Sequence, residues 1–120
     1  MPFVLPSTWI AHHRSSDGEL VGYLCPEDDG YIPRTVFGYP LGLVTTRADA
    51  VRTLETRGLA CLAEGWTMLD EDGEDVRVQI LSASPERVVV VDAPYGYYEA
   101  GSPRFVLPVP TDRLIPSSPR

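Results

Sequence analysis

The stretch that decides the fold is WTMLDEDGEDVRVQILSASPERVVVVD, residues 66–92. It contains three apolar runs separated by two polar turns, and the first turn holds an Asp-Gly pair at 72–73, which favours tight chain reversal. Apolar and polar residues alternate over 76–80, which is typical of a strand with one buried face. The four valines of 88–91 indicate a central strand covered on both faces. The stretch therefore predicts an antiparallel meander, which we expect to continue into the apolar run 105–110.

A hairpin is predicted upstream of the meander. An Asp-Gly pair at 17–18 is flanked there by apolar-rich runs at 9–14 and 19–25. The sequence is compatible with a two-residue loop of type I′ and with a four-residue loop that pairs Arg14 with Glu19. Both loops leave the same side chains on the same face of the hairpin, so the choice between them stays open.

One principal helix is predicted near 46–57, within the segment TTRADAVRTLETRGL. Thr46 is the expected N-cap, with Asp49 at the third helical position in a variant of the capping box. Gly58 is expected to end the helix in the left-handed conformation, with Leu59 folded back onto Leu54 as in a Schellman motif.

The fold class that follows from these elements is α+β and mainly antiparallel β. We expect a strongly bent sheet or a small barrel of five to seven strands, with the helix covering an open end or face. The 120 residues fit one domain of ordinary size. We expect that domain over 1–115, with 116–120 as a flexible tail.

The charge of the chain excludes some classes of partner. Seventeen acidic residues outnumber ten basic ones, all of them Arg, and the net charge is −7. An acidic chain without a basic stripe is not expected to bind nucleic acid, but it suits docking onto a basic protein. No leader-like pattern and no apolar run of membrane-spanning length is visible, so we expect a cytoplasmic protein without a membrane partner. Cys25 and Cys61 lack redox or metal spacing and are expected to be buried thiols, and no cofactor is predicted.

Two adjacent histidines raise the question of a metal or catalytic site. On a strand, His12 and His13 point to opposite faces, and they are the only histidines in the chain. They cannot converge on one ion, so no metal site is predicted. His13 is expected on the apolar face at the edge of the core, and His12 on a polar face beside Arg14 and Tyr23. A histidine on that face remains a candidate general acid or base.

The segment with the strongest binding character is PYGYYEAG, residues 94–101. Tyr95, Tyr97 and Tyr98 lie there in an irregular connection between two predicted strands. Tyrosine combines a large apolar area with a polar tip and is enriched at interfaces for that reason. We expect at least one of these rings to be exposed and used for binding.

Three segments together resemble a known set of sequences. They read WIAHHRSSDGELVGYLCPEDDGYIPRTVFGYPLG from Trp9, ETRGLACLAEGWTM from Glu55 and SPERVVV from Ser84. They are similar to small uncharacterised proteins of GC-rich Gram-positive bacteria, which share a W-x-x-H-x-R-S-D-G-E-x-x-G-Y-L hairpin, a helix ending in R-G-L and a closing β meander. The resemblance covers most of the chain and implies no activity. An extra serine between Arg14 and Asp17 departs from the pattern and leaves the length of that turn open.

The leading functional hypothesis is a non-catalytic binding or interaction module for a protein or small-molecule partner. Its candidate residues are Tyr95, Tyr97 and Tyr98, with His12, Arg14 and Tyr23 as a second patch. One alternative is an acidic inhibitor of the immunity or antitoxin kind, which would cap a basic protein. The other is a small hydrolase or isomerase that uses His12 or His13 with Glu19. A homodimer through a sheet face is compatible with all three.

Overall fold

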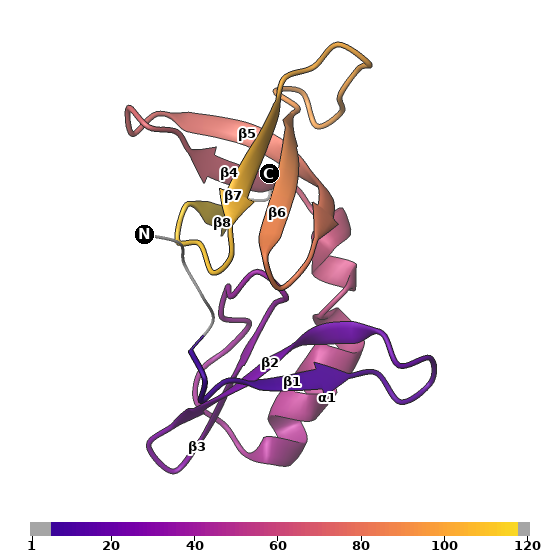
Figure 1. Cartoon of the computed structure of the whole chain (residues 1–120), viewed down its shortest axis with the longest axis vertical. Coiled ribbons are helices and arrows are strands. Elements are labelled where there is room, and N and C mark those ends of the chain that lie inside the picture. Colours follow the sequence, from indigo (N-terminus) through magenta and orange to yellow (C-terminus); the bar gives the residue numbers. More distant parts are fainter. Residues whose placement is uncertain (1–5, 118–120) are drawn as a thin grey trace.

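The computed structural model describes residues 6–117. In this range the chain forms two helices and eight strands, and the strands make up two antiparallel sheets (Figure 1). In chain order the elements are β1 (Ile10–His13), β2 (Leu20–Glu27), β3 (Gly30–Arg34), α1 (Arg47–Arg57), the 3-10 helix η1 (Ala60–Ala63), β4 (Trp66–Leu69), β5 (Asp75–Ala83), β6 (Arg87–Asp92), β7 (Arg104–Pro108) and β8 (Leu114–Pro116). The first sheet has the order β1-β2-β3, and the second has the order β7-β6-β5-β4-β8. The predicted α+β class, mainly antiparallel and with one principal helix near 46–57, is confirmed.

The strands form two separate sheets of three and five strands instead of one bent sheet or barrel. The reason lies in α1, which packs on β2 and β3. Val21 and Leu24 from β2 meet Ala50 and Leu54 from α1 in one fully buried cluster. Because the helix covers this face, the first sheet completes its own core without strands from the second half of the chain.

Helix α1 begins and ends at the predicted residues, but the conformation of Gly58 at its end differs from the prediction. The Oγ1 of Thr46 accepts a hydrogen bond from the backbone nitrogen of Asp49 at 3.1 Å, so Thr46 is the N-cap. Gly58 has φ −56° and ψ −44°, which is right-handed and not the left-handed conformation of a Schellman motif. A Cβ at this position would overlap the carbonyl oxygens of Val21 and Leu54. Glycine is therefore required because α1 ends directly against the backbone of β2, and not because the chain turns.

The second sheet contains the predicted meander together with one unpredicted strand. Strands β4, β5, β6 and β7 pair in sequence order, and Trp66, Val78, Val90 and Leu107 point into their common core. Strand β8 pairs with β4 and extends to Pro116, which lies within the expected tail. Residues 118–120 lie outside the described residues. Three residues that include a proline are too few to form a recognisable strand pattern.

Three aromatic side chains join the two sheets. Phe37 and Tyr39 lie in the connection between β3 and α1, and both rings meet Trp66 edge to face, at centroid distances of 5.0 and 5.3 Å. Phe37 and Trp66 are fully buried, and the Nε1 of Trp66 donates to the carbonyl oxygen of Cys61 at 2.9 Å. The connection from the first sheet thus inserts into the core of the second and fixes their relative position.

The two cysteines are free and buried, as the sequence predicts. Burial raises the pKa of the Cys61 thiol from 9.0 to about 11, and the charge of Glu64 adds to the shift. Because the thiolate is the reactive species, we expect the native protein to resist iodoacetamide at about pH 8, whereas the chain unfolded in urea reacts at both cysteines. Mass spectrometry of the labelled protein measures the difference. Fast double labelling without urea would contradict the buried positions.

Candidate functional site

The loop between β1 and β2 is the longer of the two predicted forms. The backbone nitrogen of Arg14 donates to the carbonyl oxygen of Glu19 at 2.7 Å, which closes a four-residue loop. A type I′ turn needs positive φ at both central residues, and in this loop Gly18 alone has it, at +76°. The Arg14 guanidinium hydrogen-bonds the carboxylate of Asp17 at 2.7 Å and lowers the pKa of that carboxyl to about 2. This exposed ion pair orders the loop.

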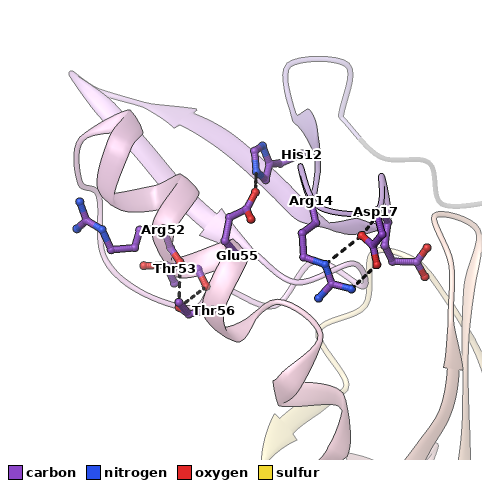
Figure 2. Close-up of polar contacts among 8 residues, drawn as sticks. His12, Arg14, Asp17, Arg52, Thr53, Glu55 and Thr56 are labelled. Carbon is purple, nitrogen blue, oxygen red and sulfur yellow. Dashed lines mark hydrogen bonds and ion pairs between the residues drawn. The ribbon is translucent and has the colours of Figure 1, made fainter.

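The two histidines lie on the faces opposite to those predicted. The register shifts between His12 and His13, and His12 pairs with Gly22. The His12 side chain points toward α1, where its Nε2 lies 2.7 Å from the Oε2 of Glu55 (Figure 2). His13 is exposed and does not lie at the edge of the core. The prediction assumed a regular strand, and an irregularity in the pairing reverses its assignment of the faces.

The predicted patch of His12, Arg14 and Tyr23 is not a continuous surface. Tyr23 is only 4% exposed and lies on the face of the first sheet that points away from α1. His12 lies on the face toward α1, and Arg14 is held within its own loop. The carboxylate beside His12 belongs to Glu55 and not to Glu19, the partner that the enzymatic alternative assumed.

The tyrosine segment is exposed, as expected. Tyr95, Tyr97 and Tyr98 expose 79, 61 and 42% of their surface, and the rings of the first two lie 6.2 Å apart. The base of the segment is anchored, because the Nε2 of Gln79 donates to the carbonyl oxygen of Gly96 at 2.8 Å. The three rings are therefore presented to solvent from a backbone that is fixed to β5.

A cavity of about 460 Å³ lies at the junction of the two sheets. Its lining comes from the residue before β1, from the end of β3 with the following turn, and from the connection between β7 and β8. The lining includes Trp9, Arg34, Gly38, Pro110, Asp112 and Arg113. None of the six site residues predicted from the sequence, all of which lie within 6–117, lines it. Its volume falls within the range of small-molecule binding sites.

The first wall of the cavity is the face of the three-stranded sheet that points away from α1. Tyr23 lies opposite Arg34 in the sheet, and the Trp9 ring packs on Tyr23 at a centroid distance of 5.9 Å. The Arg34 guanidinium lies 4.9 Å from the centroid of the Trp9 ring, which is a cation–π contact. Burial raises the pKa of Tyr23, and the charge of Glu86 adds to the shift.

A tight turn after β3 brings this wall close to the second sheet. Gly38 has φ +95°, and its backbone nitrogen donates to the carbonyl oxygen of Thr35 at 2.9 Å. Its own carbonyl oxygen accepts from the Nη1 of Arg34 at 2.9 Å. A Cβ at this position would lie 3.0 Å from Pro110 and 3.5 Å from the Trp9 ring. A side chain here would occupy the space between the walls, so glycine keeps the cavity open.

The second wall is the connection 109–113 between β7 and β8. The backbone nitrogen of Thr111 donates to the carbonyl oxygen of Phe37 at 3.4 Å. The Nε of Arg113 donates to the carbonyl oxygen of Leu69 at 2.7 Å. These two bonds attach the connection to the turn after β3 and to the end of β4. The connection is thereby held against both sheets.

The sequence pattern did not reveal this cavity because its walls come from positions 9, 34–38 and 108–113, which are far apart in the chain. The local signals at these positions are the Gly- and Pro-rich segments FGYP and PVP. Such segments predict turns, but they do not predict which turns meet.

Further observations limit the classes of function. Within residues 6–117, no group of three or more His, Cys, Asp or Glu side chains is placed to hold a metal ion. No helix in this part of the chain combines the length and the apolar character needed to cross a membrane. Comparison with protein-family models, curated proteins and solved structures found no match. The cavity and the exposed tyrosines are thus the features from which a function can be inferred.

Proposed function

We propose that the protein is a non-catalytic binding module of the cytoplasm, and that its ligand site is the cavity between the two sheets. The observation that supports this function is an indole wall and two guanidinium groups within one concave site of about 460 Å³. Small-molecule sites typically combine apolar walls with a few polar groups that set the orientation of the ligand. Here Trp9, Pro108 and Pro110 supply apolar surface, and Arg34 and Arg113 supply the polar groups.

The side chains around the cavity favour binding over catalysis. Neither histidine and neither cysteine lines it, so the residues most often used as general base or nucleophile are not in contact with its contents. The two buried thiols are free, which suits a reducing compartment such as the cytoplasm.

NMR titration of the ¹⁵N-labelled protein with a library of small fragments tests the proposal. We expect fragments that contain an aromatic ring to shift the amide signals of Gly38, Thr111 and Arg113 in a saturable way. Trp9→Ala should weaken this binding about tenfold, because it removes the aromatic wall. Tyr97→Ala removes an exposed ring elsewhere and should leave it unchanged. Saturable shifts found only on other surfaces, or none at all, would overturn the cavity as the ligand site.

A second candidate function, docking of a protein partner, is favoured by the exposure of the tyrosine segment. Three rings that expose 42 to 79% of their surface on an anchored loop offer contact area with little loss of conformational freedom on binding. The net charge of −7 suits a basic partner, which is the situation of an acidic inhibitor of the immunity kind.

A triple alanine variant at Tyr95, Tyr97 and Tyr98 tests this second function. We expect it to lose the partners that the wild-type protein retains in a pull-down, with unchanged unfolding by urea because the three rings are exposed. A double variant, Leu43→Ala with Val106→Ala, removes exposed apolar surface elsewhere and serves as the control. Identical sets of retained partners for the triple variant and the wild type would exclude the segment as a docking surface.

A further inference from the structure

Among residues 6–117, neither of the two arginines of the cavity has an acidic partner. Within residues 6–117, the arginines that form ion pairs are Arg14 and Arg52, and both pairs lie at the surface. Arg34 and Arg113 line the cavity together with one acidic residue, Asp112. Two positive side chains and one negative one leave the cavity with a formal charge of +1, whereas the whole chain carries −7. The lining of the cavity is therefore more positive than the chain as a whole.

One edge of the Arg34 guanidinium has no hydrogen-bond partner in the part of the chain that the structure describes. Its Nη1 donates to the carbonyl oxygen of Gly38 at 2.9 Å, while its Nε is buried and has no partner among the described residues. The Nε–H and one N–H of Nη2 point along the same edge, which is the edge that pairs side-on with a carboxylate. Because a buried donor without an acceptor is unfavourable, an acceptor placed there would be bound strongly.

From this geometry we infer that the cavity binds a small aromatic carboxylate. The carboxylate pairs with the unpartnered edge of Arg34, with Arg113 as a second cation, and the ring of the ligand packs against Trp9 and Pro110. The inference rests on the proposed binding function and adds the chemical class of the ligand. A carboxylate carries one negative charge and matches the formal charge of +1, whereas a phosphate monoester, with nearly two, exceeds it.

The indole of Trp9 has two roles in this arrangement. It lies over the Arg34 guanidinium at 4.9 Å and holds it in place before a ligand enters. Because the Nε of Arg34 is shielded from water, a ligand oxygen reaches it only if the side chains that cover it move. The indole N–H signal of Trp9 is therefore expected to move when a carboxylate binds.

Matched pairs of acids and primary amides test the inference. The probes are benzoate and benzamide, 2-naphthoate and 2-naphthamide, and indole-3-acetate and indole-3-acetamide, titrated by NMR at about pH 7, where the acids are ionised. We expect each acid to bind about tenfold or more tightly than its amide, because hydrogen bonds to a charged acceptor are stronger than those to a neutral one. Arg34→Gln should reduce this preference to about threefold or less. Arg104→Gln, which removes an exposed arginine of β7 outside the cavity, should preserve it.

The outcomes separate the ligand class from the binding function. Equal binding of acids and amides at the cavity would overturn the inference but not the binding function. The same holds if other fragments bind at the cavity and none of the six probes does. Failure of every fragment to bind there would overturn both. The comparison of acid with amide in the wild-type protein does not depend on any variant folding. Arg34→Lys adds a second test, because it retains the charge without the side-on fork and should show an intermediate preference.

Discussion

Trp66→Ala is expected to lower the free energy of unfolding by about 3–5 kcal/mol. This is a large part of the total free energy of unfolding of a single domain, which is typically about 5–15 kcal/mol. Trp66 is 1% exposed and makes edge-to-face contacts with Phe37 and Tyr39, which come from the connection between β3 and α1. Its removal leaves a cavity at the point where the two sheets meet, and it also removes the hydrogen bond to Cys61. Urea unfolding followed by circular dichroism measures the change.

Two matched variants show whether the effect belongs to this contact. Phe37→Leu leaves a smaller apolar side chain at this contact and should cost less than Trp66→Ala, because it removes less buried volume. Tyr95→Ala truncates a ring that is 79% exposed and should change stability by no more than about 0.5 kcal/mol. If Trp66→Ala lowers the free energy of unfolding as little as Tyr95→Ala does, the aromatic contact does not hold the sheets together.

Gly58→Ala is expected to destabilise the protein by about 3 kcal/mol, which is the upper end of the usual cost of overpacking a core. This is expected although the backbone of Gly58 is helical. At a helical position with free space, the same substitution stabilises by about 0.5–1 kcal/mol, because it restricts the unfolded chain. Here the added methyl group would overlap the carbonyl oxygens of Val21 and Leu54. The oxygen of Val21 belongs to β2, so α1 has to move away from β2 to relieve that overlap, and the oxygen of Leu54 belongs to α1 itself, so the last turn of the helix has to distort as well. The midpoint of urea unfolding reports the sign and the size of the effect.

Gly101 provides the matched control for this substitution. It has no positive φ, and no atom lies within 4 Å of the position of an added Cβ. Gly101→Ala should therefore be neutral or stabilise by up to about 1 kcal/mol. If both glycines tolerate alanine equally well, the close approach of α1 to β2 is not present in solution.

The elements that the sequence predicts correctly are those with local signals. The capped start of α1 depends on two residues three positions apart, Thr46 and Asp49, and it occurs as expected. Alternation along β5 and the valine run of β6 define strands whose neighbours are next in the chain, so the meander is also predicted. The left-handed conformation expected for Gly58 is wrong, because glycine is required there by the close approach of the distant Val21 and not by a turn of the chain.

The candidate site was not predictable because it depends on contacts between distant segments. Trp9 and Arg34 become cavity residues only when the connection 109–113 crosses in front of them. The register shift at His12 has no sequence signature, yet it moves that side chain to the helix face and leaves His13 in solvent. The exposure of the three tyrosines could be predicted, because an irregular connection rich in Gly and Pro lies outside the core of a sheet.

The connection between β7 and β8 has a further consequence for the cavity. The two strands are the opposite edges of the second sheet, and the connection starts and ends at opposite ends of β5: Pro108 lies level with Arg87, beside the Ala83 end, and Leu114 lies level with Met68 and Val76. In a flat sheet these points would be separated by four strand spacings of about 4.8 Å, roughly 19 Å, and by a further displacement along β5, whereas a chain over six residue steps reaches only about 20 Å. The short connection therefore requires a curled sheet, and it joins the two edges of that sheet beside the cavity. The cavity wall is thus preorganised by the strand order, and a ligand loses little affinity in ordering it.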